Sequence, residues 1–286
     1  MTASRANLAR FLDAHPQVAL VEVVEALGST PREKGAWMLV SPGAMFETIG
    51  GGQLEFMAID RAREMLAGVA LHPPFGQLRP TGGETGERLS IPLGPEIGQC
   101  CGGRVELSIR VAGDEMRADL LRQAEAEEAR LPRILIFGGG HVGHALAAAF
   151  ALLPVKVIVV DVRAEALDGM PPAVDTQLTP VPEEAVRDAP PGSAFVVLTH
   201  DHALDFLIVA EALKRDDAAY VGMIGSKTKR ATFRSWYVKE AGGDEAALSR
   251  LVCPIGGDSV RDKRPAVIAA LAAAEIMTAL SVSGAA

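Results

Sequence analysis

The stretch from Gly138 to Gly143, which reads GGGHVG, is the feature that most constrains how this 286-residue chain can fold. Gly138, Gly140 and Gly143 form the pattern G-x-G-x-x-G directly after the apolar run 134–137 and directly before a helical pattern. The first glycine makes a tight turn, the second lets the backbone approach a pyrophosphate, and the third lets helix and strand pack closely. The pattern therefore predicts a Rossmann-type unit that begins near residue 133.

The residues after this motif have the order and spacing of a nucleotide-binding unit. A second apolar strand, 156–160, is followed by Asp161, about 20 residues beyond the glycines, where a carboxylate would accept hydrogen bonds from ribose hydroxyls. The intervening helix begins near His141, and its N-terminus offers free N–H groups to an anion. We expect a dinucleotide, another nucleotide or a related phosphate-bearing ligand here, although the same turn can also be purely structural.

Strands and helices alternate through the rest of the C-terminal half. Further strands are predicted at 194–199 and 220–224, and the helices at 142–152, 202–214 and 227–240. This alternation, with strands rich in valine and isoleucine, predicts a parallel sheet covered on both faces. The predicted organisation is α/β, with an N-terminal domain at 1–112, a connecting helix at 113–132 and a Rossmann-like domain at 133–286.

Three loops should lie at the carboxyl ends of the predicted parallel strands, where such sheets bind ligands. His200, Asp201 and His202, with Asp205 one turn later, could bind a metal or transfer protons, or Asp201 could simply cap the next helix. Ser226 could contact a ligand or act only as a helix cap. The third loop, 253–258, is a glycine-containing turn with a side that could face a ligand.

The N-terminal half predicts a smaller α/β domain. Its pattern indicates a helix at 6–14, strands at 18–24, 36–40, 88–92 and 104–111, a helix after Gly52, and a long loop at 73–86 that is rich in proline and glycine.

Two turns of this half have the composition of anion sites. Ser29, Thr30 and Arg32 place two hydroxyls and a guanidinium on one turn, a set that suits phosphate, although a proline turn with a solvated arginine is the alternative. A second loop, made of Gly50, Gly51 and Gly52, precedes a helix whose first turn contains Glu55.

Cys100 and Cys101 are adjacent and are followed by two glycines. Neighbouring thiols do not easily close a disulfide or chelate one metal together, so the pair suggests a soft metal ligand or a sulfur carrier. The alternative is that both are small buried apolar residues.

Composition argues against several classes of protein. A net charge of -8 without a long basic run disfavours a nucleic-acid partner. Three cysteines do not form a disulfide framework, and the N-terminal residues lack the apolar core of a secretory signal. The apolar run 265–280 contains Glu275 and is interpreted as a packed helix, not a membrane span. We therefore expect a cytoplasmic protein without a membrane partner, with a homodimer as the default oligomer.

Taken together, these segments resemble the XdhC/CoxI family, the accessory proteins that mature the molybdenum cofactor of xanthine dehydrogenase and related enzymes. The matching segments, in chain order, are GSTPREKGAWM (28–38), GGGQLE (50–55), GQCCGGRVEL (98–107), IFGGGHVGHAL (136–146), VVDVR (159–163), LTHDHALD (198–205), YVGMIGSKTKR (220–230) and CPIGG (253–257). The double cysteine and the ending RDKRPAVIAALAAAEI are closer to the XdhC branch than to the CoxI branch.

The resemblance implies a chaperone that binds molybdenum cofactor (molybdopterin), assists its sulfuration with a cysteine desulfurase as sulfur donor, and delivers it to apo-xanthine dehydrogenase. It implies at most a sulfur-transfer activity, with Cys100 and Cys101 as the residues that act. Many relatives read PIGLDIG and then TPEE where this chain has the segment 257–265, so the resemblance assigns that segment no role. An NAD(P)-dependent oxidoreductase, with His200 or His202 as acid or base, and a nucleotide sensor remain the alternatives.

Overall fold

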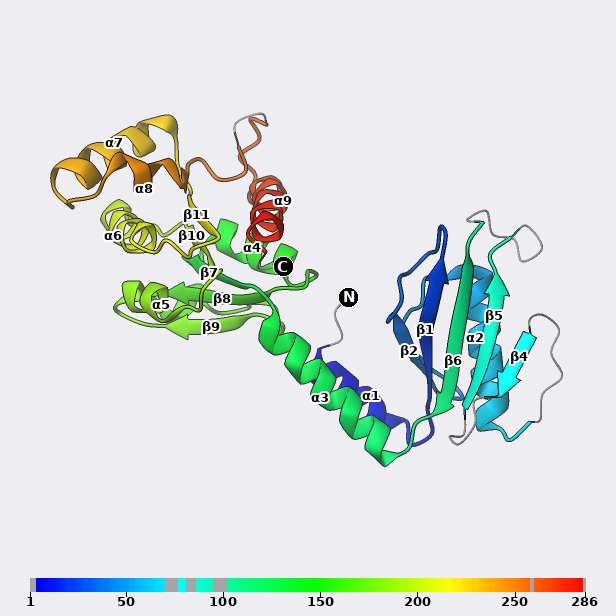
Figure 1. Cartoon of the computed structure of the whole chain (residues 1–286). Helices are drawn as coiled ribbons and strands as arrows, with labels where there is room; N and C mark the ends of the chain where they lie inside the picture. The colour runs from blue at the N-terminus through cyan, green and yellow to red at the C-terminus, as the bar shows by residue number, and fades with distance from the viewer. Residues whose placement is uncertain (1–3, 70–76, 81–85, 95–101, 258–259, 285–286) are drawn as a thin grey trace. The chain divides into compact units, whose positions relative to one another are not determined.

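The computed structural model describes residues 4–69, 77–80, 86–94, 102–257 and 260–284. The described chain up to Ala129 forms one compact unit and the chain from Arg130 onward forms another, each built around its own sheet (Figure 1).

The N-terminal unit contains an antiparallel sheet in the order β3-β2-β1-β6-β5-β4. Its strands are β1 (Ala19–Leu27), β2 (Trp37–Val40), β3 (Met45–Glu47), β4 (Gln77–Pro80), β5 (Gly86–Pro92) and β6 (Arg104–Val111). The predicted long loop at 73–86 is wrong at β4, because these residues pair with β5 and the pairing overrides their weak strand propensity.

Helix α2 (Gly52–Leu66) packs on one face of this sheet, and apolar side chains of α1 (Arg5–Ala14) and α3 (Asp114–Arg130) cluster with Leu20 and Leu39 of the other face. Alternating side chains of β1 separate the two layers, since Val21 and Val23 pack with α2 whereas Leu20 packs with α1 and α3. The helix expected to connect the domains places Leu120 and Ala124 in this second layer.

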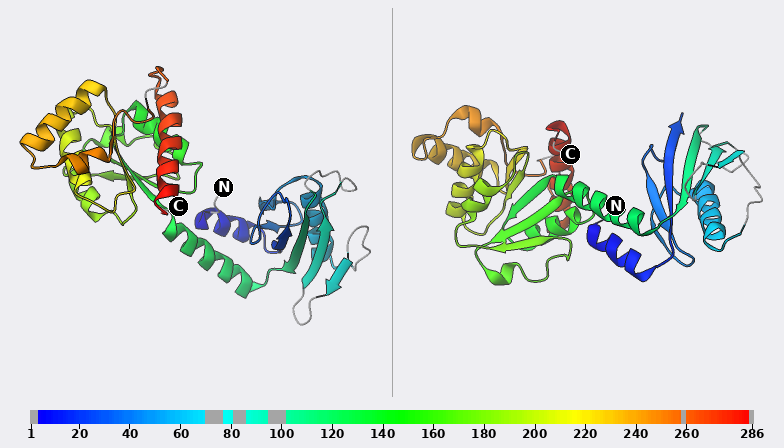
Figure 2. Two further views of the ribbon diagram at one scale, coloured as in Figure 1. Left: turned by 45° about the horizontal axis from the view of Figure 1, so that its top comes forward. Right: turned by 60° about the horizontal axis from the view of Figure 1, so that its bottom comes forward.

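The C-terminal unit contains a parallel sheet in the order β12-β11-β10-β7-β8-β9, and Figure 2 shows this unit from two further sides. Its strands are β7 (Arg133–Phe137), β8 (Lys156–Asp161), β9 (Asp175–Leu178), β10 (Ala194–Val197), β11 (Tyr220–Met223) and β12 (Leu251–Val252). Counted along the chain, this is the order 3-2-1-4-5-6 of the doubly wound dinucleotide fold, and its switch point lies between β7 and β10. The predicted parallel sheet is confirmed.

Helices cover both faces of the parallel sheet, as expected for such a sheet. They are α4 (His141–Phe150), α5 (Pro182–Asp188), α6 (His202–Leu213), α7 (Lys227–Lys239), α8 (Glu245–Ser249) and α9 (Pro265–Val282), with a 3-10 turn η2 (Ala164–Ala166). One buried cluster joins α4 and α9 to the sheet, and a second joins α5, α6, α7 and α8 to its other face.

Helix α9 is long and apolar enough, by length and composition alone, to cross a bilayer, and it is the single such helix among the residues described. Five of its side chains, including Ala272, Ile276 and Leu280, are buried in the cluster that contains α4. Glu275, in the middle of the helix, accepts a hydrogen bond from Tyr220 at 2.5 Å. The helix therefore forms one layer of the Rossmann unit.

Candidate functional site

The glycine-rich turn lies at the switch point of the parallel sheet, against the end of β10. Gly138 has a φ of +117°, and a Cβ added there would lie 2.5 Å from the carbonyl oxygen of Leu198. A Cβ on Gly143 would lie 2.1 Å from the carbonyl oxygen of Gly138. Both positions are therefore restricted to glycine by sterics, as the sequence pattern predicts.

Gly140 occupies a different environment, because a Cβ added there would meet no atom within 4 Å. The residue is the N-cap of α4, where its carbonyl accepts the N–H of His144 at 2.9 Å, and both Gly140 and His141 are exposed. Free N–H groups at the N-terminus of this helix therefore face open space, an arrangement that can accept an anion.

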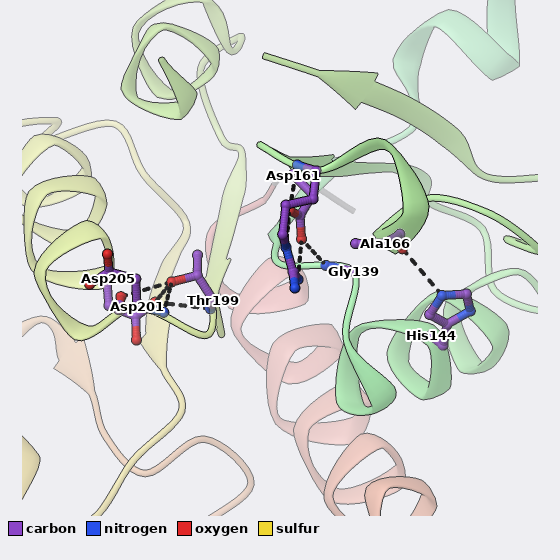
Figure 3. A network of polar contacts seen from close by, with 8 residues as sticks. Gly139, His144, Asp161, Ala166, Thr199, Asp201 and Asp205 are labelled. Atoms are coloured by element: carbon purple, nitrogen blue, oxygen red, sulfur yellow. Dashed lines mark hydrogen bonds and ion pairs between the residues drawn. The ribbon is translucent and has the colours of Figure 1, made fainter. Parts of the chain in front are cut away.

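Asp161, at the end of β8, is buried and holds the glycine-rich turn directly (Figure 3). Its Oδ2 accepts the N–H of Gly139 at 2.8 Å, and its Oδ1 accepts the N–H of Arg163 at 2.9 Å. The Arg163 guanidinium lies 3.3 Å from Oδ1 and 3.4 Å from Oδ2. Burial alone would raise the pKa of Asp161, but these hydrogen bonds and the arginine charge outweigh it and lower the pKa below the ordinary value.

Gly139 and Arg163 are site residues that the sequence reasoning missed. Gly139 occupies a variable position of the G-x-G-x-x-G pattern, yet it donates to Asp161 and lies so close to η2 that a Cβ would be 2.1 Å from the carbonyl oxygen of Ala166. His144 also lies 3.3 Å from that oxygen (Figure 3). The position of Arg163, two residues after Asp161, is a signal that the sequence contains, because basic side chains near this strand end can pair with ligand phosphate.

We expect Asp161→Asn to lower the free energy of unfolding at neutral pH by about 1–3 kcal/mol, because the Arg163 charge loses its buried partner. The folded-state pKa is depressed, so this stabilisation is present above the ordinary pKa of 3.8 and is lost as the pH falls through the folded value. Urea unfolding at several pH values should therefore show a difference between variant and wild type that shrinks in acid. Asp262→Asn is the control, since Asp262 pairs with Arg264 in the same i, i+2 pattern but on the surface, and its effect should be smaller. A deficit that is constant from neutral to acid pH would contradict the role assigned to the carboxylate.

The loop after β10 is anchored by a buried ion pair. Asp205 of α6 is fully buried, accepts the N–H of Thr199 at 2.9 Å, and lies 2.7 Å from the Thr199 hydroxyl. Its second oxygen accepts from the ammonium of Lys229, whose side chain is 11% exposed. The pair joins α6 to α7 and holds Thr199 in place. The Cα of Thr199 lies beside Gly138, so the pair also stabilises the glycine-rich turn.

The other predicted residues of these loops have helix-capping roles. Asp201 caps α6 by accepting the N–H of Ala203 at 2.8 Å, and Ser226 caps α7 by accepting the N–H of Lys229 at 3.2 Å. His200 and His202 are exposed. The structure thus favours the capping alternative for this loop, and within the described ranges no cluster of three or more histidine, cysteine or acidic side chains has the geometry of a metal site.

The two predicted anion turns of the N-terminal unit lie against each other. A Cβ on Gly50, whose φ is +124°, would lie 2.6 Å from Cβ of Pro31 and 3.3 Å from Cγ of Arg32. Arg32 is exposed at this contact. The structure therefore brings together motifs that are about 20 residues apart, which sequence spacing did not predict.

The glycines after the cysteine pair lie against the first of these turns. Ser29 forms a parallel bridge with Gly102, and a Cβ on Gly103 would lie 2.3 Å from the Ser29 carbonyl oxygen. Cys100 and Cys101 themselves lie outside the described residues. Gly102 follows Cys101 directly in sequence, so the described backbone next to the pair meets the turn that contains Ser29, Thr30 and Arg32.

Glu55 organises the glycine loop from the first turn of α2. Its Oε2 accepts the N–H of Ile49 at 3.0 Å and that of Gly51 at 3.1 Å, and it also contacts the Thr48 hydroxyl. Glu55 thus holds the loop in place through an internal network. Glu47, which the sequence reasoning missed, has a φ of +63°, and burial raises its pKa although the positive charge of Arg32 opposes the shift.

The fold and the glycine-rich turn at the switch point define a Rossmann-type protein with an added antiparallel-sheet domain. The model of the XdhC Rossmann domain matches residues 134–276, and that of the XdhC and CoxI family matches residues 11–72. The chain belongs to the XdhC and CoxI family.

The chain is similar to a known protein in sequence and to a solved structure in fold. Over 266 residues the chain is 27% identical to the uncharacterized protein YqeB of Escherichia coli (strain K12). The aligned region covers 91% of this chain but 43% of that protein. The chain thus spans less than half the length of that relative. A crystal structure of a protein described as a xanthine dehydrogenase from Bacillus halodurans has a TM-score of 0.75 at 17% identity, covering 98% of this chain and 96% of that one. This likeness shows that the two chains share their fold.

Proposed function

We propose that this protein is an accessory chaperone for xanthine dehydrogenase that binds molybdenum cofactor, assists its sulfuration and delivers it to the apo-enzyme. The observation that supports the proposal is that three motifs of the N-terminal unit contact one another: the turn with Ser29 and Arg32, the glycine loop, and the glycines after the cysteine pair. Gly50 lies on Pro31 and Arg32, and Ser29 pairs with Gly102, which directly follows the two cysteines in the sequence.

The residues present fit the chemistry of this cargo. Molybdopterin carries a phosphate and a soft molybdenum–sulfur centre. Arg32 and the hydroxyls of Ser29 and Thr30 are suited to a phosphate or another oxyanion, whereas the N–H groups of Gly50 and Gly51 already donate to Thr48 and Glu55. A thiolate from Cys100 or Cys101 is a ligand type that soft centres prefer and a group that can carry sulfur. The remaining chemistry belongs to the cofactor and to the sulfur donor.

The partners that follow from this proposal are a cysteine desulfurase and apo-xanthine dehydrogenase, in a reducing cytoplasmic compartment where both thiols stay free. We propose a homodimer as the default assembly.

We expect a Cys100→Ser, Cys101→Ser double variant to keep its fold, since serine is nearly isosteric, yet to lose cofactor retention or activation of the apo-dehydrogenase. We expect the two single variants to differ, with one of the two cysteines accounting for most of the loss. Pterin content after purification and the rate of client activation measure the two functions. Cys253→Ala, which removes the buried thiol of the other unit, is the control and should leave both at the wild-type level. A double variant that binds cofactor and activates its client normally would remove the cysteines from the proposal.

A second candidate function rests on the crevice of the parallel sheet, which has the dinucleotide-fold strand order, open space at Gly140, and Asp161 and Arg163 beside the turn. These features suit an NAD(P)-binding oxidoreductase or a nucleotide sensor. Mass analysis of the molecules that copurify with the protein distinguishes the candidates: a pterin supports the chaperone, and a nicotinamide nucleotide without pterin supports the second candidate.

A further inference from the structure

A pocket of about 670 Å³ lies at the β12 edge of the parallel sheet, two strands away from the switch point. One wall is a face of α7 that contributes Lys227, Arg230 and Arg234. The opposite side is β12 and the segment after it, and α9 contributes Glu275. Its volume is within the range of small-molecule sites in proteins, which is about 300–1,000 Å³.

The ionic side chains that line this pocket are mainly basic, although the chain as a whole has a net charge of -8. Lys227, Arg230 and Arg234 recur at i, i+3 and i+7 on α7, a spacing that places them on one helix face. Arg234 is paired with Glu245, which lies outside the lining, and the one carboxylate in the described lining is that of Glu275. Its Oε1 already accepts from the Tyr220 hydroxyl at 2.5 Å and lies 3.3 Å from the N–H of Gly256.

Helix stability does not explain cations at this position. The dipole of a helix favours acidic side chains in the first turn, and α3 and α5 follow that rule with Asp114 and Glu183. The first turn of α7 contains no acidic residue and begins with Lys227, with Arg230 one turn later. Helices α1, α4 and α9 also lack an acidic residue in the first turn, so what indicates an anion is the set of basic side chains that line a pocket beside the N-terminus of α7, where the helix dipole also favours an anion.

The segment after β12, which forms the other side of the pocket, packs closely at Gly256 and has free space at Gly257. A Cβ on Gly256 would lie 3.0 Å from Cβ of Leu271, so the segment after β12 packs closely on α9, whereas a Cβ on Gly257 would meet nothing within 4 Å. Cys253, also in the lining, is buried, and burial raises the pKa of its thiol. The thiol therefore stays neutral at neutral pH and does not repel an anion.

We propose that this pocket is a second anion-binding site, which takes a small molecule bearing a phosphate or pyrophosphate group. Among the described residues, its lining shares no member with the crevice residues Gly138, Gly140, Asp161, Arg163 and Thr199. The proposal does not depend on the proposed function. The pocket also agrees with the expectation that the loop after β12 presents a side to a ligand, because Cys253, Pro254 and Gly257 line it.

The test is titration of the full-length protein with inorganic pyrophosphate by isothermal calorimetry at low ionic strength. We expect an Arg230→Gln, Arg234→Gln double variant to bind the pocket's pyrophosphate about tenfold more weakly or worse, because two charge-assisted contacts are lost. Arg234 also pairs with Glu245 at 2.6 Å on the surface, a pair that contributes little to stability, so the variant should fold normally. Arg264→Gln is the matched control, since Arg264 is an exposed arginine paired with Asp262 outside the pocket.

The possible outcomes distinguish this site from the crevice and from a protein interface. A Gly140→Val variant should retain the binding that the double variant loses. If pyrophosphate fails to bind the wild-type protein, or binds the double variant and wild type equally, the proposal is wrong. If a polyglutamate peptide binds in an Arg230-dependent manner and pyrophosphate does not, the basic face recognises acidic proteins and the small-molecule proposal is overturned.

Discussion

Replacing Asp205 by alanine is expected to lower the free energy of unfolding of the Rossmann unit by about 3–5 kcal/mol. The substitution leaves the Lys229 ammonium in a site where its side chain is 11% exposed, and it removes the acceptor of the Thr199 N–H. An unpaired buried charge and an unpaired buried N–H are both costly. This should be among the most destabilising polar substitutions in the unit.

Most of this loss in the free energy of unfolding comes from leaving one charge without its partner, and less comes from the attraction between Asp205 and Lys229. An Asp205→Ala, Lys229→Met double variant removes both charges, so it should be more stable than the sum of the Asp205→Ala and Lys229→Met losses predicts. As a surface control, Lys214→Ala breaks the pair with Glu211, in which the lysine is 65% exposed, and should cost about 0–1 kcal/mol.

The two tryptophans allow this measurement to be made on one unit alone. Trp236 lies in α7 of the Rossmann unit and Trp37 lies in β2 of the N-terminal unit, so a Trp37→Phe background makes fluorescence report the unfolding around Lys229. Additive losses across the double-mutant cycle would show that Asp205 and Lys229 do not interact energetically, and the assigned anchoring role would be wrong.

The parallel sheet was predictable from sequence because its central strands are short apolar runs. The four residues of β10 are all buried, and the pattern identifies such strands without tertiary information. Strand β9 was not predicted because its four residues, DTQL, are all exposed at the sheet edge and lack apolar alternation. Strand β12 consists of two residues, which is too short for any periodicity to be detected.

The geometry of the candidate site was predictable where it is encoded locally and not where it depends on distant contacts. The glycine motif and Asp161 are local features. Sequence spacing grouped Asp205 with the neighbouring histidines as a metal or proton-transfer cluster, whereas its partner in the structure is Lys229, 24 residues away. Only the packing of α6 against α7 creates that pair. The contact of Gly50 with Pro31 likewise depends on how β3 and α2 follow β2, which no single turn encodes.

Gly140→Val is expected to leave the fold intact while weakening ligand binding in the crevice by roughly 100-fold, which is about 2.7 kcal/mol. The fold should tolerate the change because Gly140 has a φ of -74° and a Cβ there meets no atom within 4 Å. The same open space is the path by which a phosphate would reach the N–H groups at the start of α4, and a branched side chain would block that path.

Gly113→Val provides a control with the same type of hydrogen bond and the same free space around an added Cβ. Gly113 precedes α3 and accepts the N–H of Arg117 at 3.0 Å, as Gly140 accepts that of His144 at 2.9 Å, and a Cβ there also meets nothing within 4 Å. Valine at either position should therefore affect helix initiation to a similar extent, so a difference in ligand binding reports the crevice alone. Copurifying pterin and titration with NAD measure binding, and thermal unfolding checks the fold. If Gly140→Val retains both ligands, the ligand site lies elsewhere in the chain. If it destabilises the protein far more than Gly113→Val does, Gly140 is a structural residue.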